Sequence, residues 1–185
     1  PTMGALHEGH LSLVQQAKEF SDEVWISIYV NELQFNNTYD FDTYPRDLDQ
    51  DISKAEKAGV DVLFIPEQEY LHNGDKYEKI LSGGKGNILE GSSRPGHFDG
   101  VLTIVNRFLS LTLPRYLVLG QKDAQQYYLI KDMLSSKFPK TQFISAPIVR
   151  DNRGLDLSSR NILLEETSRN LAGELFNTLK IVGFQ

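Results

Sequence analysis

Four short apolar runs, rich in β-branched and aromatic residues, are the feature that most constrains the fold of this chain. They cover residues 24–30, 61–66, 116–119 and 142–149, and their composition is typical of buried strands. The segments between them carry apolar residues at helical spacing. Strands that alternate with helices and are apolar on both faces predict a parallel sheet covered by helices on both sides. We therefore expect an α/β fold.

The segments between the apolar runs predict the helices. Leu11, Val14 and Ala17 form one apolar face at helical spacing,. Pro45 suits the first turn of a second helix, and Gly59 suits its end,. The expected helices cover residues 11–20, 45–58, 99–111, 122–137 and 165–179, whereas residues 67–98 show no regular pattern.

Composition excludes several classes of protein. The net charge of −6 argues against a broad nucleic-acid surface, although it allows a local cluster of positive groups for small anions,. No apolar run approaches the length of a membrane span, and no signal peptide is visible,. The chain contains no cysteine, so thiol chemistry and disulfides are absent,. We expect a cytoplasmic protein that binds neither nucleic acid nor membrane.

Two histidines three residues apart, His7 and His10, stand directly before the first expected helix, with Gly9 between them. Glycine lets a ligand approach the backbone closely. The free N–H groups and positive dipole end of a helix favour phosphate groups, and imidazoles add further donors. This arrangement predicts adenylyl or nucleotidyl transfer, although a capping or surface role for the two histidines stays open.

The sequence disfavours two other sites. A zinc site lacks ligands, because His72 and His97 are the other histidines and there are no thiols,. A P-loop around Gly84 also fails: Lys79 stands where the motif needs its first glycine, and Gly86 stands where it needs Ser or Thr,.

Three more polar clusters follow predicted strands. Gln34 comes after the first strand, Lys122, Asp123 and Gln126 come after the third, and a Ser-Ser-Arg sequence at 158–160 comes after the fourth. Ligands of open parallel sheets bind at the carboxyl ends of the strands. The amides suit a substrate with hydroxyl and carboxylate groups, and the cations suit phosphates. Each cluster taken singly is also compatible with an ordinary polar loop or a solvated ion pair of little energetic value.

Taken together and in this order, the motifs resemble those of the pantothenate synthetase (pantoate–β-alanine ligase) family. The His-x-Gly-His sequence alone indicates only the wider HxGH nucleotidyltransferase superfamily. The resemblance runs almost from end to end and comprises residues 1–10, 31–35, 44–46 with Asp51, 94–105, 120–126 and 148–161.

The resemblance implies a Rossmann-like, doubly wound parallel sheet with helices on both faces. Residues 1–161 would form the ATP- and pantoate-binding domain, with its opening strand missing upstream. Residues 162–185 would form a helix that leads to a C-terminal lid domain largely absent from this chain. The family resemblance also implies a homodimer.

The resemblance further implies a reaction. Pantoate would attack the α-phosphorus of ATP, with Mg²⁺ present, to give an enzyme-bound pantoyl adenylate and pyrophosphate. β-Alanine would then attack the acyl carbon, giving pantothenate and AMP. This chemistry needs no side-chain nucleophile, in agreement with a chain that lacks cysteine.

Site residues follow from the same resemblance, motif by motif. His10, His7, Lys122 and Arg160 would be catalytic, and Gln34 and Gln126 would hold pantoate. Asp51 is a candidate for organising Mg²⁺. The implied ATP-binding residues are Met3, Gly4, Ala5, Leu6, His7, Glu8, Gly9, His10, Gly120, Gln121, Lys122, Asp123, Val149, Leu157, Ser158, Ser159 and Arg160.

The chain departs from the family pattern at two positions. Glu32 stands where the family usually has proline, which implies a looser Gln34 loop and a negative charge near an anion site. Leu157 replaces a methionine, a nearly volume-neutral change,. Two alternatives to the ligase remain: another adenylyl-transferring enzyme of the superfamily, and a truncated, non-catalytic nucleotide-binding module.

Overall fold

The computed structural model describes residues 1–72 and 77–183. Four residues of the irregular segment 67–98 and the last two of the segment 162–185 therefore lie outside the described residues. The strands are β1 (Trp25–Ser27), β2 (Val62–Phe64), β3 (Tyr116–Gly120) and β4 (Gln142–Ala146). The helices are α1 (Glu8–Lys18), α2 (Thr38–Asp42), α3 (Leu48–Lys57), α4 (Gln68–His72), α5 (Glu90–Ser93), α6 (His97–Thr112), α7 (Ala124–Lys137) and α8 (Glu166–Val182), with 3-10 helices η1 (Glu32–Gln34), η2 (Gly83–Asn87) and η3 (Ser159–Leu163).

The strands are parallel, as expected, but they form two separate two-stranded sheets. β1 pairs with β2, and β3 pairs with β4. A single parallel bridge joins Thr2 to Ile28, so the start of the chain runs beside the end of β1. A cavity of about 380 Å³ lies between the two pairs and is lined by residues of both β1 and β3. The expected α/β class is confirmed, with a slot between the two halves of the sheet.

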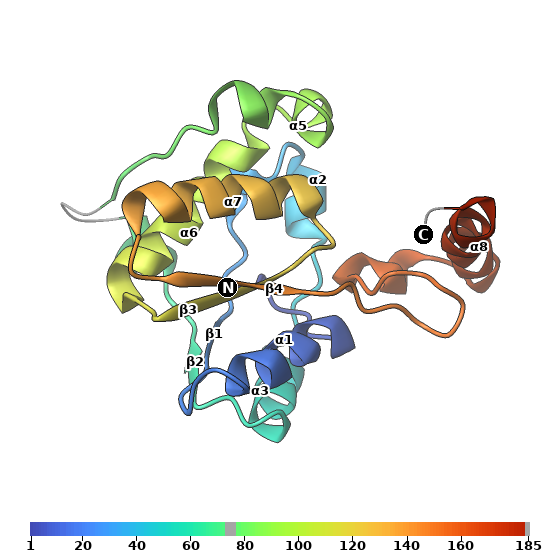
Figure 1. The fold of residues 1–185 in the computed structure, drawn as a ribbon, viewed down its shortest axis with the longest axis horizontal. Coiled ribbons are helices and arrows are strands. Elements are labelled where there is room, and N and C mark those ends of the chain that lie inside the picture. The colour runs from blue at the N-terminus through green and yellow to red at the C-terminus, as the bar shows by residue number, and fades with distance from the viewer. Residues whose placement is uncertain (73–76, 184–185) are drawn as a thin grey trace.

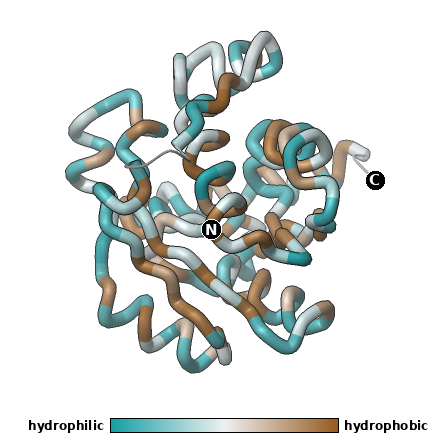
Figure 2. The backbone as a smooth tube through the Cα atoms, turned by 90° about the vertical axis from the view of Figure 1, so that its left-hand side faces the viewer, coloured by the Kyte–Doolittle hydropathy of each residue, from teal (hydrophilic) through white to brown (hydrophobic). Residues whose placement is uncertain are grey.

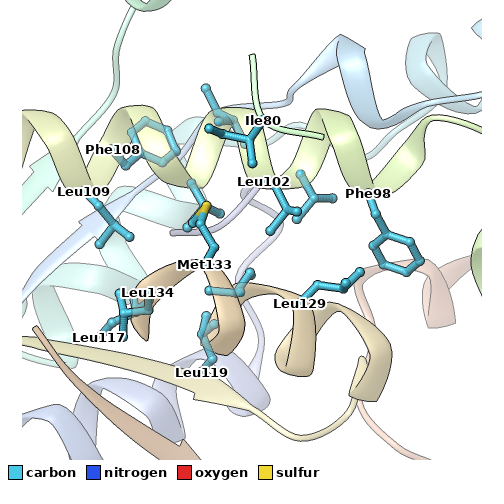
Figure 3. Close-up of a cluster of buried hydrophobic side chains, with 14 of the residues drawn as sticks. Ile80, Phe98, Leu102, Phe108, Leu109, Leu117, Leu119, Leu129, Met133 and Leu134 are labelled. Atoms are coloured by element: carbon cyan, nitrogen blue, oxygen red, sulfur yellow. The ribbon is translucent and has the colours of Figure 1, made fainter. Parts of the chain in front are cut away.

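Helices cover both faces of the strands. Figure 1 shows α1 and α3 on one side of β3 and β4, and α6 and α7 on the other. The larger core cluster joins α6, α7 and β3, and includes Phe98, Phe108, Leu119 and Met133 (Figure 3). A smaller cluster of Val14, Val24, Ile26 and Ile28 joins α1 to β1. In Figure 2, hydrophobic stretches alternate with hydrophilic ones along most of the backbone.

All five expected helices begin one to three residues from their expected positions, and the two largest shifts, at α1 and α3, follow from side-chain caps. α1 begins at Glu8 instead of residue 11, because the side chain of His7 caps it. α3 begins at Leu48 instead of residue 45, because the Asp47 carboxylate accepts the N–H of Gln50 at 3.0 Å and provides the N-cap,. Short helices that the sequence did not predict also occur: η1 and α2 precede α3, and α4, η2 and α5 lie within residues 67–98.

The last helix, α8, lies at the edge of the molecule (Figure 1). It packs on the loop that follows β4: the Arg150 guanidinium lies 3.7 Å from the ring centroid of Phe176, and Asn177 donates to the carbonyl of Arg153 at 2.9 Å. Among the described residues, no helix combines the length and apolar character that crossing a membrane requires.

Candidate active site

A pocket of about 280 Å³ opens where β1 and β3 end. It is lined by part of the first ten residues, by residues of η1 and α6, by the β3–α7 junction and by the loop after β4. Most of the predicted site residues meet here: Met3, His7, Gly9, His10, Gln34, Gly120, Lys122, Asp123, Gln126, Val149, Leu157, Ser158, Ser159 and Arg160. The predicted residues outside its lining are Gly4, Ala5, Leu6, Glu8, Gln121 and Asp51.

His7 and His10 cap the helix α1 together. The Nδ1 atom of His7 accepts the backbone N–H of Gly9 at 3.1 Å, and Nδ1 of His10 accepts the N–H of His7 at 3.3 Å. The two rings lie 4.0 Å apart between centroids. A neutral imidazole has one acceptor and one donor nitrogen, so both Nε2 atoms carry the proton. The capping role left open by the sequence and the donor role are therefore compatible.

The electrostatics keep both rings neutral. Burial lowers the pKa of His10 to about 3, and the positive charges nearby act in the same direction. Burial, followed by the charges of Lys122 and Lys54, also lowers the pKa of His7. Near neutral pH each histidine is thus a neutral N–H donor, which can stabilise negative charge on a phosphate oxygen without a net charge of its own.

The backbone turn before His7 is held from α3. Asp51 is only 2% exposed, and its two carboxylate oxygens accept the N–H groups of Ala5 at 2.8 Å and Leu6 at 2.6 Å. The Asp51 carboxylate thus faces the turn, and Asp51 does not line the pocket. In the part of the chain that the structure describes, no group of three or more His, Asp or Glu side chains could hold a metal ion.

Gln34 lines the pocket from η1. Its Oε1 atom accepts from Nδ2 of Asn31 at 3.2 Å, and its Nε2 atom lies 3.0 Å from the sulfur of Met3. Asn31 is almost fully buried and also donates to the carbonyl of Gly100 in α6 at 3.1 Å. A side chain added at Gly100 would lie 2.8 Å from the nitrogen of Gln34 and closer still to the carbonyl of Leu33. η1 and α6 therefore touch backbone to backbone.

The polar residues that line this pocket but were not among the predicted site residues include Asn31, Tyr44, Arg94 and His97. Nδ1 of His97 donates to the carbonyl of Gln34 at 2.6 Å, and Arg94 also reaches this carbonyl, at 3.4 Å. Tyr44 is buried beneath the guanidinium of Arg160. A polar residue directly after a strand, such as Asn31, was a signal that could have been used.

Lys122 stands at the end of β3, between two carboxylates. Its Nζ atom lies 3.4 Å from Asp123 and 3.4 Å from Asp156. Burial works against the charged form, but the two aspartates outweigh it and raise the pKa of Lys122. The side chain is therefore a fixed positive charge in the pocket.

The Ser-Ser-Arg loop, whose last two residues begin η3, supplies the other cation. Arg160 forms a two-pronged ion pair with Asp40 of α2, with distances from 2.9 to 3.2 Å. Ser159 donates to the carbonyl of Ala5 at 3.1 Å, which docks this loop on the turn before His7. The pocket thus carries two groups of side chains: two imidazole donors, an ammonium and a guanidinium, here called the phosphate side, and the amides of Gln34 and Gln126, here called the amide side.

Comparison with known proteins identifies this arrangement. A protein-family model described as pantoate-beta-alanine ligase matches residues 1–183. The chain belongs to the pantoate–β-alanine ligase family. It is 46% identical over 181 residues to the pantothenate synthetase of Francisella tularensis subsp. novicida, covering 97% of this chain and 69% of that protein. It is 47% identical over 182 residues to that of Lysinibacillus sphaericus, covering 98% of this chain and 64% of that protein.

Solved structures of the family agree with the fold. The pantothenate synthetase of Thermus thermophilus superposes with a TM-score of 0.91 at 39% identity, covering 97% of this chain and 66% of that one. The pantoate-β-alanine ligase of Francisella tularensis, complexed with β,γ-ATP and β-alanine, gives a TM-score of 0.87 at 46% identity, covering 97% of this chain and 69% of that one. The chain thus spans about two thirds of the length of these relatives.

Proposed function

We propose that this chain is the nucleotide- and acid-binding part of a pantoate–β-alanine ligase, which joins pantoate to β-alanine at the expense of ATP, giving pantothenate, AMP and pyrophosphate. The observation that carries the proposal is that one pocket carries both the phosphate side and the amide side. Positive charges and N–H donors line it from the start of α1, the end of β3 and the start of η3, and amides line it from η1 and α7. A triphosphate and a small hydroxy acid would meet between them.

The first step would be in-line transfer of the adenylyl group. A carboxylate oxygen of pantoate forms a bond to the α-phosphorus of ATP, and the bond from that phosphorus to the bridging oxygen of pyrophosphate breaks. Negative charge grows on the α-phosphate oxygens and on the departing pyrophosphate. Donors already aimed at such charge contribute most to the rate. The Nε2–H groups of His7 and His10, Lys122 and Arg160 would supply them.

The second step would use the acyl adenylate. The amine of β-alanine attacks the acyl carbon, the bond to the phosphate oxygen of AMP breaks, and the amine loses one proton to solvent. Gln34 and Gln126 would hold the pantoate portion through amide hydrogen bonds. Asp123 would meet the ribose, and the backbone of Val149 would meet the adenine.

Mg²⁺ would enter with ATP and neutralise part of the charge of its phosphates. Because the described side chains form no metal cluster, the oxygens of the nucleotide would supply most of its ligands. The predicted role of Asp51 at the metal stays untested, and its contacts favour the different role described in the next subsection.

We also propose, from the family resemblance, a cytoplasmic homodimer in which residues 1–161 form the substrate-binding domain and residues 162–185 lead to a lid. Sedimentation analysis of the purified protein tests the dimer, because a single species of monomer mass across micromolar concentrations would contradict it.

The proposed reaction is tested by incubating the protein with ATP, Mg²⁺ and pantoate, with and without β-alanine. We expect pyrophosphate release that depends on pantoate, and AMP and pantothenate that appear only with β-alanine. Release with another acid instead of pantoate would indicate a different adenylyl-transferring enzyme. ATP binding without any release would indicate a non-catalytic nucleotide-binding module.

A further inference from the structure

We propose that Asp51 is a positioning residue for the nucleotide site: it holds the turn Gly4–Ala5–Leu6 in the shape that places Met3 and His7. This inference rests on the proposed function for the identity of the nucleotide, but its geometry is independent of it. It assigns to Asp51 a task other than binding Mg²⁺.

The carboxylate of Asp51 is fully engaged with the turn. One oxygen accepts the N–H of Ala5 and the other accepts the N–H of Leu6, at 2.8 and 2.6 Å. Both bonds are charge-assisted and shielded from water, since Asp51 and Leu6 are buried,. A carboxylate used in this way is oriented by two neighbouring backbone donors and presents no face to the pocket.

The turn needs such support because its backbone is strained. Gly4 has φ of 81° and Ala5 has φ of 49°. Glycine reaches this left-handed region freely, but a residue with a Cβ atom does so at a cost in free energy. Gly4 also has no room for a side chain, because a Cβ atom there would lie 2.8 Å from Oδ2 of Asp51. The carboxylate therefore closes directly over the turn that it stabilises.

Two more side chains complete the support. Lys54, one turn after Asp51 on α3, donates to the carbonyl of Leu6 at 2.6 Å. Ser159 donates to the carbonyl of Ala5 at 3.1 Å. Each backbone N–H and C=O group of Ala5 and Leu6 is thus hydrogen-bonded to a side chain from elsewhere in the chain. None of these four backbone groups takes part in the hydrogen bonds of a helix or strand.

The turn leads directly into the cap of α1. Leu6 is followed by His7. The His7 ring accepts a hydrogen bond from the backbone N–H of Gly9, and the backbone N–H of His7 donates to the ring of His10. A change in the direction of residues 4–6 would therefore shift both imidazole donors and Met3, which contacts Gln34. Asp51 acts on the nucleotide through this backbone and not by contact.

The decisive variant is Asp51→Asn. An amide keeps the shape but offers one acceptor, and its NH₂ group faces a backbone N–H. We expect the affinity for the β,γ-imido analogue of ATP, measured by calorimetry, to fall on the order of ten- to a hundredfold, as for the loss of a buried charge-assisted hydrogen bond. The Mg²⁺ concentration that gives half of the maximal binding should stay within about twofold of wild type. The matched control is Asp49→Asn, on the same helix and exposed, which should bind like wild type.

A second substitution separates positioning from metal binding. Ala5→Gly removes the strain of the left-handed residue. The loss of affinity caused by Asp51→Asn should therefore be at least about threefold smaller in the Ala5→Gly background than in the wild-type background. A metal ligand would give the opposite pattern: a large rise in the Mg²⁺ requirement and no rescue by glycine. That pattern would overturn the proposal.

Lys54→Met serves if Asp51→Asn does not fold, which circular dichroism would reveal. It removes one support from the same turn, so we expect a smaller loss of analogue affinity, about three- to tenfold, with an unchanged Mg²⁺ requirement. An affinity equal to wild type would contradict the role of the turn. Because these measurements need no turnover, a wild-type protein that binds the analogue but makes no pantothenate would refute the proposed function alone.

Discussion

The two sides of the pocket are built differently. On the amide side, Gln34 is fixed by Asn31, which is only 1% exposed, and by backbone contact between η1 and α6. On the phosphate side, Arg160 is held by Asp40, and these side chains are 42% and 41% exposed. Buried hydrogen bonds are strong and fix one geometry, whereas an exposed ion pair contributes about 0–1 kcal/mol.

This difference implies that the amide side is formed before substrate binds. Arg160, on the phosphate side, can instead exchange its partner. Arg160 could leave Asp40 for a phosphate oxygen with little loss of free energy. Lys122 is intermediate, since it is partly buried between two carboxylates. Substitutions on the two sides should therefore differ in size and in the quantity that they change.

The largest effect is expected for Lys122→Ala. It removes the fixed positive charge from the phosphate side, so kcat should fall on the order of a hundred- to a thousandfold. Lys131→Ala, an exposed lysine of α7, is the matched control. Pyrophosphate release at saturating substrates measures the effect, and a loss of only a few-fold would remove Lys122 from the catalytic residues.

Next in size is Gly100→Ala, which breaks the amide side. The added methyl group would overlap the Leu33 carbonyl and crowd the Gln34 nitrogen, so the free energy of unfolding should fall by about 1–3 kcal/mol. The KM for pantoate should rise more than the KM for ATP, since η1 carries Gln34. Chemical denaturation and initial rates measure both, with Gly84→Ala, which meets open space, as the control. Equal changes in the two KM values would contradict a distinct amide side.

The buried part of the phosphate side should make stability depend on pH. Burial lowers the pKa of His10 from 6.5 to about 3. Between these values the unfolded chain binds a proton that the folded chain does not, so the free energy of unfolding falls as pH decreases from 6.5 toward 3. His10→Gln should make this dependence shallower by up to about 1.4 kcal/mol per pH unit. Denaturant unfolding at pH 7, 5.5 and 4.5 tests this, and equal slopes in both proteins would count against it.

The smallest effect is expected for Asp40→Asn. If the ion pair with Arg160 is exchangeable, removing its negative charge should free the guanidinium and lower the KM for ATP about two- to fivefold. The control is Asp42→Asn on the same helix, which is also exposed. A higher KM for ATP would mean that Asp40 orients Arg160 and that both sides of the pocket are preformed.

The sequence predicted the strands and their parallel pairing well, because apolar runs bounded by turn residues carry a local signal. Each observed strand lies inside or close to its predicted run. Which strands pair with each other was beyond that reasoning, since pairing depends on contacts between segments far apart in sequence. Helix starts were shifted at His7 and Asp47 because side-chain caps override the spacing of apolar residues.

Motifs at strand ends predicted much of the pocket lining, since in a parallel sheet such positions converge. His97 and Tyr44 were not assigned to the site because they act through contacts with Gln34 and Arg160 that only the folded chain creates. The turn at Ala5 was also hidden, because no property of an alanine in a sequence indicates a left-handed backbone.

The reciprocal capping by His7 and His10 has a consequence for protein engineering. Each ring uses one nitrogen to start α1 and leaves the other for the pocket, so a replacement must meet two geometric demands at once. Libraries that vary the two positions one at a time would discard pairs in which a new cap and a new donor compensate each other. Joint randomisation of both positions is the search that this geometry calls for.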